Sequence, residues 1–216
     1  MANISVRCFS EALKRNVHFE MYLPNDKPDE QGRKMKTLFL LHGYAGDAGI
    51  WVPEHIAQKY NIAVVAPNGE NGFWLDGLST GHKYCTFVGV ELVDYLRRTF
   101  GLAKSADETC IIGLSMGGFG TWVMGITYPN YFSAMAPICG GGMYWNAARL
   151  KDLPIWAFHG ALDDTVLPEE SIHMVAAVNR NGGNAKITVY PDVAHASWVN
   201  AYADDAMWEW MFSQKR

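Results

Sequence analysis

The chain has 216 residues, of which 49% are hydrophobic and 19% are charged, and its formal net charge is −4. These proportions are typical of a folded globular protein and exclude a disordered chain. The weakly acidic balance gives no basic surface for nucleic acid, and no apolar run approaches the roughly 20 residues that cross a membrane. We therefore expect one domain over residues 1–216 that binds neither nucleic acid nor membranes.

The beginning of the chain mixes charged residues such as Arg7 and Glu11 into its apolar ones. It has neither the hydrophobic stretch nor the cleavage signature of a signal peptide. The four cysteines are scattered and form no CxxC pair: Cys8, Cys85, Cys110 and Cys139. This usage favours free thiols in a reducing compartment, so we expect a cytoplasmic protein.

Short apolar or alternating runs predict about eight strands along the chain. They are expected over Ile4–Phe9, Val17–Leu23, Thr37–Leu41, Ile62–Ala66, Thr109–Leu114, Ser133–Cys139, Pro154–Phe158 and Lys186–Tyr190. Helical patterns separate most of them: Trp51–Tyr60, the stripe Val88, Leu92, Tyr95 and Leu96, the segment after Ser115, Pro168 to Gly182, and the stripe Ala203, Met207, Trp210 and Met211. This alternation predicts the α/β class, with a mostly parallel sheet and helices on both faces.

Two loops stand out, Pro24–Lys36 and Pro67–Lys83. The second holds four glycines and is long enough to suggest a functional role.

The stretch Gly113-Leu114-Ser115-Met116-Gly117 ends a predicted buried strand and begins a predicted helix. A strand, a sharp turn and a helix of this kind expose a serine hydroxyl above a parallel sheet. Side chains at Gly113 or Gly117 would crowd the neighbouring strand or helix. The alternative is a glycine-rich turn with an ordinary serine, because the pentapeptide alone also arises by chance.

A nucleophilic serine needs a base, and the base needs an orienting acid, at the ends of later strands. Asp163 follows one such strand, with Asp164 as the second choice, and His195 follows the last strand. The alternatives are an aspartate that caps a turn and a histidine on the surface. His42 and His159 precede glycines at strand ends and are expected to have structural roles.

The same geometry predicts an oxyanion hole. Its donors would be the backbone N–H of Met116, directly after the nucleophile, and that of Tyr44, in the loop after the third strand. The order Ser115, Asp163, His195 then predicts an active serine hydrolase.

Several motifs together resemble the α/β-hydrolase superfamily, and within it the esterase D-like serine esterases and small carboxylesterases. They are Leu40-Leu41-His42-Gly43-Tyr44, Asn71-Gly72-Phe73-Trp74, Gly113-Leu114-Ser115-Met116-Gly117-Gly118, Phe158-His159-Gly160-Ala161-Leu162-Asp163 and Tyr190-Pro191-Asp192-Val193-Ala194-His195. The resemblance implies hydrolysis of carboxylic esters without a metal or cofactor. Relatives act on acetyl, feruloyl and other cinnamoyl esters, and on S-formylglutathione.

Many relatives insert a lid before the acid strand, whereas only Gly140–Leu153 lies there in this chain. We therefore expect an open cleft without a lid domain, able to accept a bulky alcohol part. Phe73, Trp74 and Trp198 would line the acyl side, and the alternative for each is packing in the core or at the rim.

The leading hypothesis is a serine esterase for small or aromatic acyl groups, from acetyl to feruloyl, including esters linked to sugars. A thioesterase similar to S-formylglutathione hydrolase is the alternative within the same chemistry. A third hypothesis, from another class, is an inactive binding module on a hydrolase fold. The expected partner is a small-molecule ester, and assembly into a homo-oligomer is left open.

Overall fold

A computed structural model describes residues 1–24 and 32–216, so part of the predicted loop Pro24–Lys36 lies outside the described residues. Its centre is one eight-stranded sheet with the order β1-β2-β4-β3-β5-β6-β7-β8. The strands are β1 (Ala2–Ser10), β2 (Arg15–Leu23), β3 (Lys36–Leu41), β4 (Ile62–Pro67), β5 (Thr109–Leu114), β6 (Ala134–Ile138), β7 (Ile155–Gly160) and β8 (Ala185–Tyr190).

Most of this sheet is parallel. β1 pairs with β2, and β2 with β4, in antiparallel fashion, while all pairs from β4 to β8 are parallel. The prediction of about eight strands in a mostly parallel sheet is therefore confirmed. Because parallel strands end at the same edge, the loops after β3, β5, β7 and β8 meet there.

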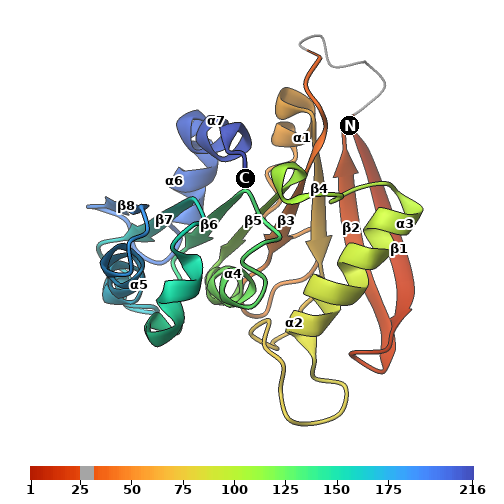
Figure 1. The fold of residues 1–216 in the computed structure, drawn as a ribbon, viewed down its shortest axis with the longest axis horizontal. Helices are drawn as coiled ribbons and strands as arrows, with labels where there is room; N and C mark the ends of the chain where they lie inside the picture. The colour runs from red at the N-terminus through yellow and green to blue at the C-terminus, as the bar shows by residue number, and fades with distance from the viewer. Residues whose placement is uncertain (25–31) are drawn as a thin grey trace.

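Helices cover both faces of the sheet, as predicted (Figure 1). In chain order they are α1 (His55–Tyr60), α2 (Tyr84–Thr86), the π-helix η1 (Phe87–Leu92), α3 (Val93–Thr99), the 3₁₀-helix η2 (Ala106–Glu108), α4 (Met116–Thr127), the 3₁₀-helix η3 (Tyr144–Leu150), α5 (Pro168–Arg180), α6 (Trp198–Ala203) and α7 (Asp205–Ser213). In Figure 1, α3, α4 and α5 lie in front of the sheet.

The hydrophobic residues form two cores, one on each face of the sheet. Successive residues of β3 alternate between them: Phe39 and Leu41 belong to the core under α3, α4 and α5, and Leu38 and Leu40 to the core under α1, α6 and α7. A strand with both faces buried reads as a continuous apolar run, which is why this segment shows no alternation of apolar and polar residues.

Two helix boundaries differ from the prediction. The first helix was expected from Trp51, but α1 begins at His55. Trp51 itself has a positive φ of 58°, and Pro53 disfavours helical geometry at the residue before it, so the helix starts only after the proline. The last predicted helix is two helices, because Asp204 leaves helical geometry and its carboxylate accepts a hydrogen bond from the N–H of Ala206 as the N-cap of α7.

The connection between β6 and β7 holds only η3, so the described residues contain no lid domain at this position. Nor does any helix in the described part of the chain have the length and apolarity needed to cross a membrane.

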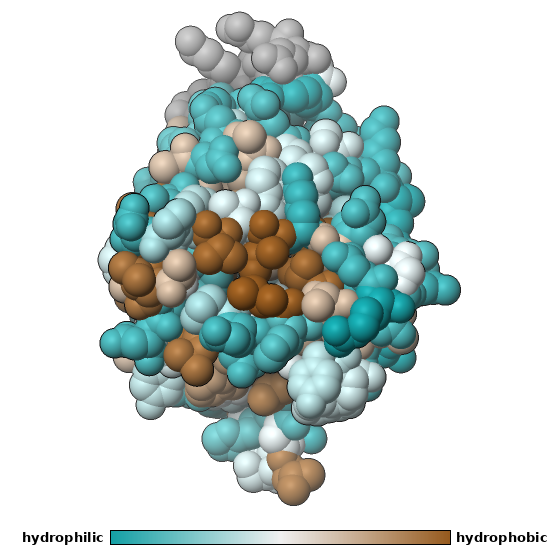
Figure 2. All heavy atoms as spheres, turned by 90° about the vertical axis from the view of Figure 1, so that its left-hand side faces the viewer, coloured by the Kyte–Doolittle hydropathy of each residue, from teal (hydrophilic) through white to brown (hydrophobic). Residues whose placement is uncertain are grey.

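At the far end of the sheet, β8 is an edge strand with one hydrogen-bonded neighbour. Figure 2 shows the molecule from this side and reveals hydrophobic residues gathered near the middle of the face. The exposed hydrophobic residues of β8 and of the neighbouring helix α5 include Val189 and Ile172. Whether copies of the chain associate stays an open prediction.

Candidate active site

Ser115 lies at the sharp turn between β5 and α4. Its φ of 53° and ψ of −117° are strained for a residue with a side chain. The turn is fixed from behind, because the N–H of Ser115 donates to the carbonyl oxygen of Ile138 at 3.0 Å. The turn thus holds the hydroxyl at the carboxyl edge of the sheet, as the sequence motif predicted.

The glycines on either side of this serine are required by close backbone contacts. A Cβ at Gly117 would lie 2.0 Å from the carbonyl oxygen of Leu41, and one at Gly113 would lie 2.3 Å from that of Gly117. Real Cβ atoms do not approach backbone atoms this closely. The predicted crowding at both positions is therefore confirmed, and α4 packs closely against the end of β3.

The structure brings Ser115, His195 and Asp163 into one hydrogen-bonded line. The Nε2 atom of His195 lies 2.8 Å from the Oγ atom of Ser115, and its Nδ1 atom lies 2.8 Å from Oδ2 of Asp163. A carboxylate only accepts, so Nδ1 carries the proton and Nε2 is free to accept the hydroxyl proton of Ser115. This is the arrangement in which an imidazole serves as a general base toward a serine.

The structure separates the two aspartates that the sequence left as candidates. Asp163 is buried, and its Oδ1 accepts hydrogen bonds from the backbone N–H of Thr165 and Val166 at 3.0 and 2.9 Å. Asp164 is exposed. Only Asp163 contacts His195, because the loop after β7 turns its side chain inward and holds it with its own backbone.

His159, which was expected to have a structural role, also contacts Asp163. It is fully buried on β7, and its Nε2 atom lies 2.9 Å from the carbonyl oxygen of Val166 and 3.2 Å from Oδ2 of Asp163. Its Nδ1 atom lies 2.8 Å from Oγ of Ser171, which donates to the carbonyl oxygen of Gly140. His159 therefore connects the loop after β7, which carries Asp163, to α5 and to the loop after β6. Sequence reasoning missed the contact with Asp163, although the i, i+4 spacing was visible.

Replacing His159 with leucine is expected to lower kcat/KM by about 10- to 100-fold. The change removes the contact of Nε2 with Asp163 and leaves the carbonyl oxygen of Val166 without its buried partner, and a lost buried partner costs about 1–3 kcal/mol. His159→Gln, which keeps an N–H donor, should recover part of the loss. The measurement is kcat/KM for an ester across the pH range. Equal activity of the wild type and the leucine variant would show that the backbone amides alone position Asp163.

The loop after β3 packs directly against the nucleophile. A Cβ at Gly43 would lie 2.8 Å from the side chain of Leu114 and 3.4 Å from the Cβ of Ser115. Tyr44 follows this glycine, and Met116 is the first residue of α4, where backbone N–H groups have no acceptor within the helix. Both predicted oxyanion donors thus lie in segments that flank Ser115, and their role stays a prediction.

His42 organises the same loop, as its position before a glycine suggested. Its Nδ1–H donates to the carbonyl oxygen of Gly43 at 2.8 Å, and its Nε2 accepts the N–H of Gly69 at 2.9 Å. Burial lowers the pKa of this imidazole below 6.5. The neutral ring therefore joins the loop after β3 to the long loop after β4.

The free energy of unfolding is expected to fall as the pH drops below about 6.5, in part because of His42. A lowered pKa means that the unfolded chain takes up the proton first, so the stabilisation is present above 6.5 and is lost toward the lowered value. Melting temperatures of the wild type and His42→Gln at about pH 7.5 and about pH 5 test this. The variant should show the smaller decrease, and equal decreases would contradict the assignment.

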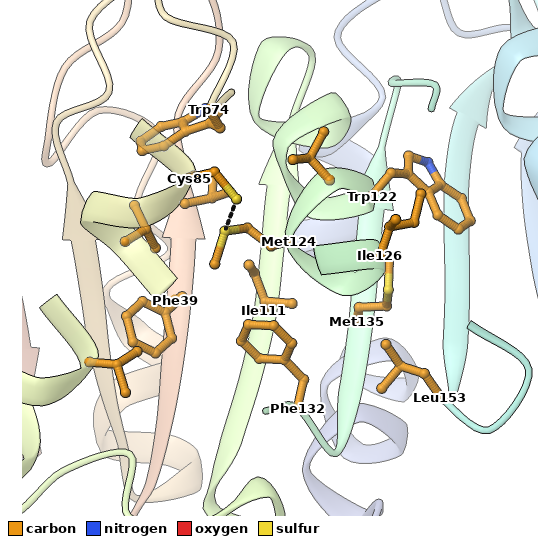
Figure 3. Close-up of a cluster of buried hydrophobic side chains, with 14 of the residues drawn as sticks. Phe39, Trp74, Cys85, Ile111, Trp122, Met124, Ile126, Phe132, Met135 and Leu153 are labelled. Atoms are coloured by element: carbon orange, nitrogen blue, oxygen red, sulfur yellow. Dashed lines mark hydrogen bonds between the residues drawn. The ribbon is translucent and has the colours of Figure 1, made fainter. Parts of the chain in front are cut away.

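Three aromatic residues were predicted to line the site, and for Trp74 this prediction is wrong. Its side chain is fully buried beside Cys85 and Met124 in the core (Figure 3). The indole N–H donates to the carbonyl oxygen of His42 at 3.3 Å, and a Cβ at Gly120 would lie 2.4 Å from the ring. Because the ring is buried under the loop after β3, it has no surface for substrate.

Phe73 and Trp198 do lie at the surface of the site. Phe73 is 40% exposed, and its ring centroid is 6.2 Å from that of Tyr44 and 6.1 Å from that of Phe119. Trp198 is half-buried and makes an edge-to-face contact with His195, with the ring centroids 5.7 Å apart. Contact with substrate remains a prediction for both.

Cys139 is a further residue of the site that sequence reasoning missed. Its Sγ atom accepts a hydrogen bond from the N–H of Ser115 at 3.3 Å. Within the described residues, Cys139, Asp163 and His195 form a group whose potential metal-ligand atoms lie within 4.8 Å of one another. Burial raises the pKa of the thiol to about 12, so it is protonated at neutral pH and acts as a hydrogen-bond acceptor. The carboxylate of Asp163 and the imidazole of His195 are already hydrogen-bonded to each other.

A serine, an aspartate and a histidine in this chain order, at the carboxyl edge of a mostly parallel eight-stranded sheet, define an α/β-hydrolase fold. A sequence model of the Esterase family, described as "Putative esterase", matches residues 10–209. The chain therefore belongs to this family, and the resemblance drawn from the sequence motifs is confirmed at the level of family and fold.

Individual relatives agree with this assignment. An acetyl esterase of Caldicellulosiruptor saccharolyticus is 37% identical over 142 residues, which are 61% of this chain and 53% of that protein. The chain thus matches about half the length of this relative. A thermostable esterase of known structure has a TM-score of 0.82 at 26% identity, covering 99% of this chain and 63% of that one.

A structure of S-formylglutathione hydrolase from Staphylococcus aureus has a TM-score of 0.80 at 22% identity, covering 98% of this chain and 99% of that one. At this identity the likeness shows the fold alone.

Proposed function

We propose that this chain, as one domain over residues 1–216, hydrolyses small-molecule carboxylic esters through a covalent acyl-enzyme. The observation that carries the proposal is the line from Asp163 through His195 to Ser115, with both hydrogen bonds at 2.8 Å. Membership of the Esterase family and the acetyl esterase relative support an ester as the substrate. Acyl groups from acetyl to feruloyl are the proposed range.

In the first half of the reaction, Nε2 of His195 takes the hydroxyl proton of Ser115 while Oγ attacks the acyl carbon. The carboxylate of Asp163 stabilises the imidazolium that forms. The N–H groups of Met116 and Tyr44 are proposed to stabilise the oxyanion, each contributing about 3–4 kcal/mol. The tetrahedral intermediate then collapses, and His195 gives its proton to the departing alcohol oxygen.

In the second half, water replaces the alcohol. His195 takes a proton from the water molecule while the water oxygen attacks the acyl carbon. The imidazolium then returns that proton to Oγ of Ser115 as the carboxylic acid leaves. The products are a carboxylic acid and an alcohol, and the enzyme is regenerated.

The proposal is tested with an ester panel of acetyl, butyryl, octanoyl and feruloyl substrates, together with labelling by a fluorophosphonate probe. Turnover of at least one ester and attachment of the probe to Ser115, located by mass spectrometry, are expected. Absence of both would favour the third hypothesis, an inactive binding module. Probe attachment to another serine would remove Ser115 from the mechanism.

A thioester is the second candidate substrate, favoured by the likeness to the S-formylglutathione hydrolase fold. The acyl transfer is the same, but a thiolate leaves without needing full protonation by His195. Comparison of kcat/KM for S-formylglutathione and for p-nitrophenyl acetate distinguishes the two. A preference of several orders of magnitude for the thioester would make it the natural class.

A further inference from the structure

The chemistry of the proposed reaction fixes which part of the substrate lies beside His195. The Nε2 proton of the imidazolium is delivered to the alcohol oxygen as the C–O bond breaks. The alcohol part of the ester must therefore leave along the surface next to the imidazole. Residues that adjoin the ring of His195 are in a position to select that part of the substrate.

The aromatic surface next to this ring is formed by Trp198 and Trp51. Trp198 lies edge-to-face on His195, and the ring of Trp51 lies 5.5 Å from that of Trp198, centroid to centroid. These rings come from two segments, the loop before α1 and the beginning of α6. Trp51 is 55% exposed, so its ring is open to contact with a ligand.

A groove of about 330 Å³ opens along these two tryptophans. Its lining is Trp51, Val52, Pro53, His55, Trp198, Val199, Tyr202 and Ala203. The groove is shallow and open to solvent, so it would cover one face of a ring or of a short chain. The groove adjoins the catalytic centre, because Trp198 lines the groove and also makes the edge-to-face contact with His195.

The groove offers few hydrogen-bonding groups to a ligand. The Nε1 atom of Trp198 and the hydroxyl of Tyr202 are both buried and have no hydrogen-bond partner in the described part of the structure, so neither reaches the open surface. The other polar side-chain groups of the lining are the imidazole of His55 and the indole N–H of Trp51. The lining therefore offers few partners to the hydroxyls of a sugar, which would stay in water, whereas an apolar group gains by covering the aromatic surface.

Resting on the proposed function, we infer that the groove between Trp51 and Trp198 binds the alcohol part of the ester and selects an aryl or alkyl alcohol over a sugar. Trp198 was expected on the acyl side, and this assignment moves it to the side of the leaving alcohol. It also narrows the expected substrates, because esters linked to sugars fall outside the preferred class.

The test uses three acetates: methyl acetate, benzyl acetate and a monoacetylated glucose. Methanol and benzyl alcohol are leaving groups of similar acidity, so the ratio of kcat/KM for benzyl to methyl acetate reports recognition. Wild-type enzyme should favour benzyl acetate about tenfold over both others. Trp51→Ala should lower the benzyl-to-methyl ratio by about tenfold. Trp145→Ala, which removes a 68% exposed tryptophan outside the groove, should leave the ratio unchanged.

Circular dichroism and melting temperature establish that both variants fold. An unchanged ratio in Trp51→Ala, with methyl acetate still hydrolysed, would overturn the inference but not the proposed function. A preference for the acetylated glucose that Trp51→Ala removes would overturn it in favour of a sugar subsite. Wild-type protein that neither hydrolyses any ester nor reacts with a fluorophosphonate would overturn both.

Discussion

Ser115→Ala is expected to lower kcat for p-nitrophenyl acetate by about 10⁴-fold or more, which is the effect of removing the nucleophile from a triad. The variant loses one oxygen atom that bonds His195 and keeps the backbone contacts of the turn, so its melting temperature should change little. Steady-state turnover and fluorophosphonate labelling measure the loss.

The matched control is Ser213→Ala, which removes an exposed hydroxyl at the end of α7 and should keep full activity. Residual activity of Ser115→Ala close to that of the wild type, in protein free of wild-type contamination, would require a different nucleophile. If Ser115→Ala kept its activity and was still labelled by the fluorophosphonate, the nucleophile would be another serine.

Gly117→Ala is expected to destabilise the protein by about 3 kcal/mol or more, or to prevent folding. The new Cβ would meet two backbone carbonyl oxygens, 2.0 Å away at Leu41 and 2.8 Å away at His42. Because neither atom can move without shifting β3 or its loop, α4 must be pushed away from the sheet. Chemical denaturation measures the change in the free energy of unfolding.

Gly125→Ala in the same helix is the control. Its Cβ would meet the Sδ atom of Met135 and a methyl group of Leu150, which are the ends of flexible side chains. Alanine also has a higher helix propensity than glycine by about 1 kcal/mol, which offsets part of the crowding. A smaller loss of stability in Gly117→Ala than in Gly125→Ala would mean that β3 and α4 separate more easily than the backbone contacts indicate.

The architecture was readable from the sequence, because buried parallel strands carry continuous apolar runs and turn residues separate them. The same reasoning placed Ser115, Asp163 and His195 at one edge of the sheet. Residues far apart in the chain meet there because all parallel strands end on the same side, so the order of strands and loops was sufficient information.

The predictions that were wrong or missing concern contacts that no local sequence pattern encodes. Trp74 lies in a loop, where side chains follow no periodicity, and its burial comes from Gly69 and Gly120 leaving room for the ring. The contacts of Cys139 with Ser115 and of Trp51 with Trp198 join separate loops. They follow only from the packing of the whole sheet edge.

The position of β8 at the border of the sheet has a consequence for how activity is lost. His195 follows a strand that is held through hydrogen bonds to β7 alone, whereas Ser115 follows a strand flanked on both sides. Peripheral strands fray at a lower free energy than central ones. In rising urea, the base should therefore separate from the nucleophile first, and catalysis should disappear at denaturant concentrations where the spectroscopic signal of the interior is still native.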